Sequence, residues 1–158
     1  MIAEAMGALG AGSAFGVLAD GRFGDGTIDN WFLRSSVHRT SGVVVVVAMV
    51  AATVKLGRLA LAGRALDRGG RVLLAVAQLT LMVQALLGIK LLDQNMGSNQ
   101  LYIHYLGGLL PLGFFLAAGW FGRIGSRTGT RVLAVLTTVG LASAAMAFFI
   151  GQSYVNRV

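Results

Sequence analysis

Long apolar stretches alternate with short polar segments along the whole chain. Residues 37–63, 71–92, 101–122 and 131–154 are each almost uninterrupted in their apolar character. An α-helix rises about 1.5 Å per residue, so about 20 such residues cross the roughly 30 Å hydrocarbon core of a bilayer. The pattern therefore predicts four membrane-spanning helices in a single domain.

Residues 1–19 are also apolar but rich in glycine, and they lack the basic start of a secretory signal. We expect them to form a fifth, shorter span, with an interfacial helix or a cleaved leader as alternatives. Residues 20–36 are polar and glycine-punctuated, which is typical of a loop outside the membrane. The expected fold is an all-α integral membrane protein with a bundle of four to five transmembrane helices.

Composition supports a lipid bilayer as the environment of the chain. Of its 158 residues, 56% are hydrophobic and 12% are charged, and there is one proline. A soluble domain of this length cannot hide so much apolar surface. The chain has no cysteine, which excludes disulfides, thiolate metal sites and a covalent c-type haem link.

The net charge of +7 is a topology signal and does not indicate nucleic-acid binding, because the basic residues lie in short connectors beside apolar spans. By the positive-inside rule, the two basic connectors face the cytoplasm and the segment 93–100 faces outside. The basic residues of these connectors are Lys55, Arg58, Arg64, Arg68, Arg71, Arg123, Arg127 and Arg131.

The two histidines of the chain, His38 and His104, lie at the outer ends of two predicted spans. One full span separates these helices, so both run in the same direction and the histidines share a depth to within about one turn, roughly 5.4 Å. Ionisable residues at membrane depth are expensive and indicate a functional site. A single metal, held by both imidazoles, is the site that this arrangement favours.

A porphyrin also needs a flat slot between helices, and the sequence places glycines at positions that would line such a slot. Gly42 and Gly108 each follow a histidine by four residues, on the same helical face one turn further in. Arg39, with Arg34 or Lys90 nearby, can pair with haem propionates. We expect a b-type haem, whereas the alternative is a solvated imidazole, packing glycines and an arginine that reaches the lipid headgroups.

Three short motifs resemble one half of the haem A synthase family. They are VHRTSG at 37–42, QALLG at 84–88 and IHYLGGL at 103–109. The resemblance covers about residues 31–120 and implies a four-helix bundle with haem ligation by His38 and His104. It does not imply the family's reaction, because Ser35 stands where the family has a glutamate, and the outer-loop cysteine pair and the second half are missing.

These observations predict a small cytochrome-like membrane subunit that serves electron transfer or haem handling in a larger respiratory or photosynthetic complex. The expected location is a prokaryotic plasma membrane or an equivalent energy-transducing membrane, with the histidines on the outer side. Gln78 and Gln84 can contact a quinone, although such residues more often bond between helices. We expect no independent catalytic activity, and the alternative function is a cofactor-free structural or assembly subunit.

The predicted topology can be tested with cysteines introduced into the cysteine-free chain. Arg68→Cys and Ser98→Cys should react with a membrane-impermeant maleimide from opposite sides of the membrane, because basic residues flank the first position and none lies in the 93–100 segment. In intact cells only the Ser98→Cys variant should be labelled. Equal labelling of both from outside contradicts the topology.

Overall fold

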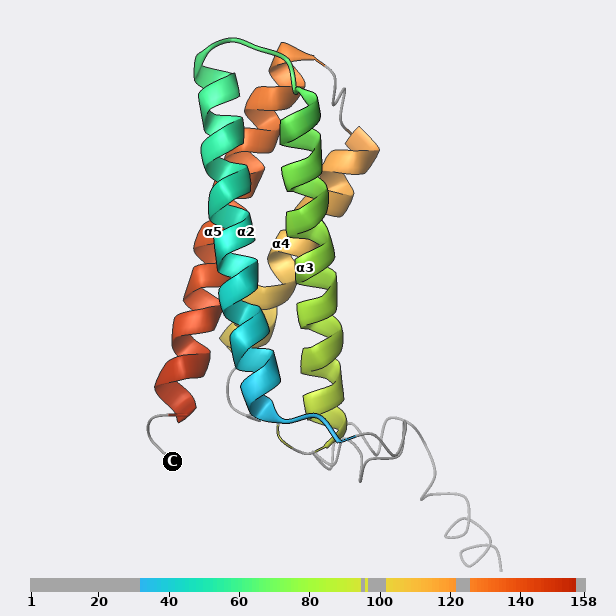
Figure 1. Ribbon diagram of the computed structural model, residues 1–158, viewed down its shortest axis with the longest axis vertical. Coiled ribbons are helices and arrows are strands. Elements are labelled where there is room, and N and C mark those ends of the chain that lie inside the picture. Colours follow the sequence, from blue (N-terminus) through green and yellow to red (C-terminus); the bar gives the residue numbers. More distant parts are fainter. Residues whose placement is uncertain (1–31, 95, 97–101, 122–125, 156–158) are drawn as a thin grey trace, which may run out of the picture.

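A computed structural model describes residues 32–94, 96, 102–121 and 126–155, and all of their regular structure is α-helical (Figure 1). The predicted all-α membrane bundle is confirmed. The predicted span 1–19 and most of the predicted loop 20–36 lie outside the described residues. The described helices are α2 (Ser35–Leu61), α3 (Arg68–Asp93), α4 (Tyr102–Phe121) and α5 (Arg127–Val155).

Three of these helices are long and apolar enough to cross a membrane: α2, α3 and the Arg127–Ser153 part of α5. The apolar stretch described in α4, Ile103–Ala117, is shorter. Large apolar side chains cover the outside of the bundle, such as Val47 at 62% exposure and Leu79 at 61%. A continuous apolar exterior is the surface that lipid covers, so this is an integral membrane protein.

Three helices begin earlier than the hydrophobic pattern predicts. Helix α2 starts at Ser35, before the predicted 37, without a side-chain cap, whereas polar side chains cap the other two. Asp67 accepts a hydrogen bond from the Gly70 backbone N–H at 2.7 Å, so α3 starts three residues before the predicted 71. Ser126 accepts one from the Gly129 N–H at 2.9 Å, so α5 starts four residues before the predicted 131. Both side chains satisfy donors that a helix start leaves open.

Helix α2 ends at Leu61, before the predicted 63, because the chain reverses at Gly63. This glycine has a φ of +63°, which side-chain-bearing residues rarely adopt. The following Arg64 N–H bonds back to the Leu59 carbonyl at 2.9 Å, a common way to close a helix end. The chain then returns along α3.

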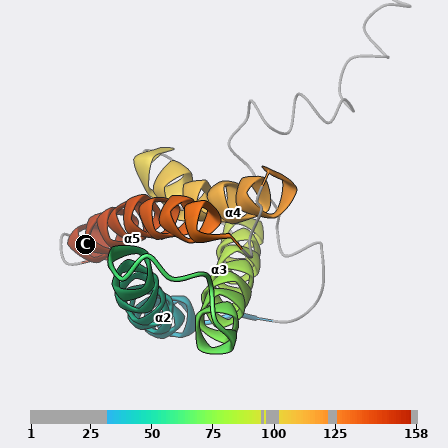
Figure 2. The same ribbon diagram turned by 90° about the horizontal axis from the view of Figure 1, so that it is seen from above.

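The four described helices form a bundle in which α5 lies between α2 and α4, and α2 lies between α5 and α3 (Figure 2). The pairs α2–α3, α2–α5 and α4–α5 pack closely, whereas α3 and α4 have the least contact. Helix α4 crosses behind α3 at an angle (Figure 1), so its first residues lie away from the last residues of α3. The bundle is therefore closed on three sides and loose on the fourth.

The two ends of the bundle differ in charge. The starts of α2 and α4 and the ends of α3 and α5 form the histidine end. At the other end, six exposed arginines outnumber the single described acid, Asp67. They are Arg58, Arg64, Arg68, Arg71, Arg127 and Arg131.

Asp67 ties the α2–α3 hairpin together by an ion pair. Its carboxylate lies 2.7 Å from the Nζ of Lys55, on α2, while it caps α3 through Gly70. The hydrogen bond from Lys55, followed by that from the Gly70 N–H, holds the pKa of Asp67 below its usual range. The charged carboxylate is therefore favoured in the folded state.

We predict that Asp67→Asn lowers the unfolding midpoint of the detergent-solubilised protein at neutral pH. Asparagine keeps the capping oxygen but loses the ion pair. Because the pKa is lower in the folded than in the unfolded chain, the carboxylate stabilises fully above the ordinary carboxyl pKa of about 4 and loses this effect as the pH falls further. The difference between wild type and variant should shrink below about pH 4, and an unchanged difference at acid pH contradicts the assignment.

Candidate haem site

The structure brings the two histidines together at the same end of the bundle. His38 lies in the first turn of α2 and His104 in the first turn of α4. Their ring centres are 6.3 Å apart and the ring planes are inclined by 65°. Both rings are half-buried, as expected for side chains that face one another inside a bundle.

A backbone carbonyl of α5 orients the His104 ring. The Nδ1–H of His104 donates a hydrogen bond to the carbonyl oxygen of Ala147 at 2.8 Å. The ring lies against Gly151, where an added Cβ would be 3.1 Å from the His104 Cε1. With the proton held on Nδ1, the lone pair lies on Nε2, which is the arrangement of metal-binding histidines.

Polar side chains of α2 and α3 hold the His38 ring. The Gln84 side-chain nitrogen lies 3.2 Å from the His38 Nε2 and also donates to the His38 backbone carbonyl at 3.1 Å. The Gln84 oxygen accepts a hydrogen bond from the hydroxyl of Ser41. Because an amide nitrogen is a donor, the His38 Nε2 is the acceptor and the ring proton lies on Nδ1. Gln84 thus makes the interhelical bonds that the sequence suggested for it.

The His38 Nδ1 is buried and has no hydrogen-bond partner among the described residues. Leaving a buried donor unpaired costs roughly 1–3 kcal/mol, so such groups are rare and often mark a functional site. On its other side, the ring lies against Gly88 of α3, where an added Cβ would be 3.3 Å from Cε1. Close packing therefore fixes the ring while one of its nitrogens stays unsatisfied.

A cavity of about 290 Å³ lies at the histidines and is lined by all four described helices. Its walls are mainly apolar, and its polar lining residues include both histidines, Gln84 and Arg39. This is the usual character of a small-molecule site, with apolar walls and a few convergent polar groups. Its lining residues include His38, Gln84, Ile89, His104, Gly108 and Leu109.

The two glycines of the predicted slot have different surroundings. At Gly42, an added Cβ would lie 3.1 Å from the Phe148 ring and 3.4 Å from the Gln84 side-chain nitrogen. At Gly108, the described residues place no atom within 4 Å of the added Cβ apart from the adjacent backbone of α4, and this glycine lines the cavity. The space beside the histidines is therefore open on the α4 side, while Phe148 fills the α2 side.

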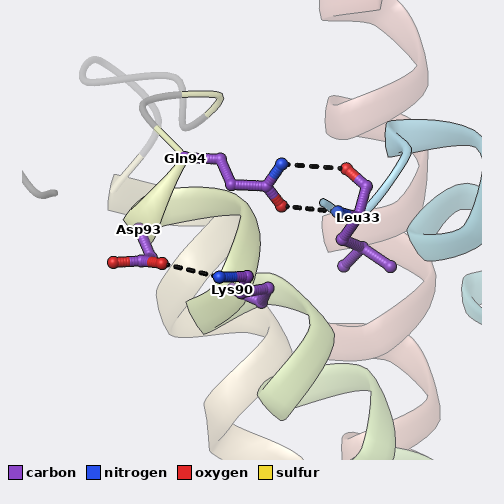
Figure 3. Close-up of polar contacts among 4 residues, drawn as sticks. All are labelled: Leu33, Lys90, Asp93 and Gln94. Atoms are coloured by element: carbon purple, nitrogen blue, oxygen red, sulfur yellow. Dashed lines mark hydrogen bonds and ion pairs between the residues drawn. The ribbon is translucent and has the colours of Figure 1, made fainter. Parts of the chain in front are cut away.

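The predicted propionate partners also differ in position. Arg39 is exposed and borders the cavity, whereas Arg34 is exposed but does not line it. Lys90 is buried, and its Nζ lies 2.8 Å from the carboxylate of Asp93 (Figure 3). A buried ammonium already paired with a carboxylate is poorly placed to bind a second anion. Among the described residues that line the cavity, Arg39 is therefore the available cation.

Gln94 fixes the start of α2 to the end of α3. Its side-chain oxygen accepts from the Leu33 N–H at 2.9 Å and its nitrogen donates to the Leu33 carbonyl at 3.3 Å (Figure 3). The Leu33 side chain is 2% exposed. Leu33 lies close to His38 in the sequence, and Gln94 lies close to Gly88. The two bonds therefore fix the position of α2 along its axis relative to α3, and these are the two helices that hold the His38 ring.

The sequence did not indicate Ala147, Gly151 or Phe148 as site residues. All three lie on α5, which the motifs did not include, and Ala147 acts through its backbone carbonyl, which every residue has. A glycine near the end of a helix is also a common packing residue. No local pattern distinguishes these positions, because only the packing of α5 against α4 and α2 brings them to the histidines.

Among the described residues, no three or more His, Asp or Glu side chains form a cluster that could hold a metal ion on their own. A haem differs in needing only axial ligands from the protein. Comparison with protein-family models, with curated proteins and with solved structures finds no match to this chain. The resemblance to the haem A synthase family thus stays a prediction from three motifs, and the geometry carries the functional argument.

Substitution of the two glycines tests their different surroundings. We predict that Gly42→Leu destabilises the purified protein by about 1–3 kcal/mol, because overpacking against Phe148 and Gln84 forces side chains to shift. Gly108→Leu should leave the unfolding midpoint of the ligand-free protein almost unchanged, because its side chain enters open space. Thermal unfolding in detergent measures both, and equal destabilisation by the two variants contradicts this difference.

Proposed function

We propose that the protein binds one b-type haem between His38 and His104 and serves electron transfer or haem handling as a small membrane subunit. The observation that carries this proposal is the separation of the two imidazoles. A metal–imidazole bond is roughly 2 Å long and the nitrogen lies about 1 Å from its ring centre, so two axial imidazoles on one metal have centres about 6 Å apart. The observed 6.3 Å agrees with this spacing.

The protonation of the rings supports the same conclusion. In both imidazoles the proton lies on Nδ1 and the lone pair on Nε2, as judged from the partners Ala147 and Gln84. The inclination of the planes is no obstacle, because rotation about a metal–nitrogen bond leaves the ligating atom in place. Gln84 would give up the His38 Nε2 on binding and would keep its bonds to Ser41 and to the His38 carbonyl.

The surroundings of the histidines also suit a planar, amphipathic group. The space at Gly108 is open, the cavity walls are apolar, and Arg39 lies at the cavity as a partner for propionate carboxylates. A haem with two histidine ligands would supply one-electron redox chemistry. The chain's own part is to hold the two imidazoles, exclude water through its apolar walls and neutralise the carboxylates.

The proposed setting is a larger membrane complex in an energy-transducing membrane, such as a prokaryotic plasma membrane. The described bundle has almost no mass outside its helices that could house a substrate site, so electron exchange would require a partner. A quinone is a chemically suitable partner for a membrane-embedded haem. The six arginines at the far end support an orientation with the histidines on the outer side.

We predict that the gently purified protein shows a sharp reduced-minus-oxidised haem spectrum of the bis-histidine type. His38→Ala and His104→Ala should each lose the haem or make it high-spin, because each removes one strong nitrogen ligand. Optical spectra and haem content per chain measure the effect. A wild-type protein without haem, even when expressed with added haem precursor, contradicts the proposal.

Gln84→Ala is the matched control in the same cavity. It removes a side chain that contacts His38 but is not itself an axial ligand, so the haem should remain bound and low-spin. Loss of haem in this variant to the same extent as in the histidine variants would mean that the cavity fails for general structural reasons.

A specific observation favours a second candidate, a cofactor-free structural or assembly subunit. The network of Ser41, Gln84 and His38 already connects α2 to α3, as an interhelical brace would. Polar bonds between membrane helices contribute about 0.6–2 kcal/mol each. In that case Gln84→Ala would loosen the bundle, and the wild-type protein would give no haem spectrum. The haem spectrum of the wild-type protein therefore distinguishes the two candidates in a single optical measurement.

A further inference from the structure

The loose side of the bundle, between α3 and α4, is also a wall of the cavity. Residues of both helices line it, among them Ile89 on α3 and Leu109 on α4. These two side chains are 52% and 54% exposed, so they border the cavity and face outward at the same time. The cavity thus reaches the outer surface of the bundle between these helices.

The opposite side of the bundle is closed at a comparable depth. There, between α2 and α5, Phe148 packs at Gly42 and Met49 packs at Gly140, each 3.1 Å from the position of an added Cβ. On α4, by contrast, Gly108 and Gly113 have no atom within 4 Å of that position. Gly108 and Gly113 of α4 therefore leave open space, whereas side chains fill the corresponding space at Gly42 and Gly140.

The surface around this opening is apolar and lies on α3, which is long and apolar enough to cross the membrane, and on the apolar helix α4. Leu86 and Leu106, on the exposed faces of α3 and α4, are 64% and 62% exposed. In an integral membrane protein such a surface contacts lipid chains. An opening surrounded by such a surface leads from the cavity into the bilayer. The polar edge of the cavity, by contrast, is at Arg39.

We infer that the ligand of this cavity is loaded sideways from the bilayer, between α3 and α4. The inference rests on the proposed haem function and adds the source of the haem, which is the pool dissolved in the membrane. Haem is flat and apolar except for its two carboxylates, so it can pass between the helices edge-first with the carboxylates toward Arg39. The alternative source is water, past the exposed rim at the histidine end.

Cross-linking of the opening tests this route in the cysteine-free chain. The double variant Ile89→Cys/Leu109→Cys is prepared without haem, linked with a bis-maleimide, and mixed with vesicles that contain haem. Linking before loading should slow the appearance of the bis-histidine spectrum at least tenfold. Linking after loading should slow the loss of haem to a haem-scavenging protein by a similar factor. Loading of the linked protein at the unlinked rate overturns the inference.

Three controls separate the possible outcomes. The same double variant treated with a mono-maleimide carries the chemical modification without the link, and it should load like the unlinked protein. Each single-cysteine variant treated with the bis-maleimide serves the same purpose. If even the unmodified double variant and the wild type bind no haem, the proposed function fails, and this result differs from a linked protein that loads at the normal rate.

A pair of tryptophan variants gives an independent test that needs no cross-link. Leu109→Trp enlarges a side chain at the opening, and Leu116→Trp enlarges one that is 59% exposed on the same helix but does not line the cavity. Leu109→Trp should slow haem loading from vesicles several-fold, whereas Leu116→Trp should load at the wild-type rate. Equal rates for the two variants contradict the sideways route.

Discussion

Close approach of helix backbones at small residues is the constraint on which this bundle depends. In lipid, apolar side chains gain little by exchanging one apolar neighbour for another, so helices associate where small residues allow dense packing. Gly107 of α4 is such a point, since an added Cβ would lie 3.1 Å from the backbone oxygen of Ser143 and 3.2 Å from the Ala147 Cβ. Gly140 of α5 likewise receives Met49 of α2. These contacts set α5 between α4 and α2.

The same kind of contact positions the imidazoles. Each histidine rests on a glycine of the helix that follows its own in the chain, His38 on Gly88 and His104 on Gly151. Gly151 also allows the His104 ring to reach the Ala147 carbonyl one turn away, which determines its protonated nitrogen. The two helix hairpins thus each contribute one ring, and the close α2–α5 contact brings the rings together while the α3–α4 side stays loose.

Polar groups are unevenly distributed along the bundle, and this asymmetry follows from their cost in lipid. At the histidine end several polar groups among the described residues are paired inside the protein, as in the Lys90–Asp93 ion pair and the bonds of Gln84 to α2. At the other end the arginines are exposed, where water and headgroups can solvate them. The His38 Nδ1 differs from these groups because it is buried without a partner among the described residues, and His38 lines the cavity.

The sequence alone determined the fold class, because the length of its apolar stretches leaves only helices as membrane-crossing structures. It also determined that both histidines lie at one end, since an intervening helix makes α2 and α4 run in the same direction. It did not determine the helix starts, because the capping roles of Asp67 and Ser126 depend on hydrogen bonds that composition does not reveal.

Only the tertiary structure decided the details of the site. Gly42 and Gly108 occupy the same position relative to a histidine in the sequence, yet one is packed against Phe148 and the other faces open space. The difference arises because α2 has a close neighbour in α5, whereas α4 turns this face toward the loose side of the bundle. The ring separation and the Ala147 carbonyl depend in the same way on how the helices are rotated and paired. A periodic apolar pattern does not specify this, since lipid and a neighbouring helix are equally suitable surroundings for most of its side chains.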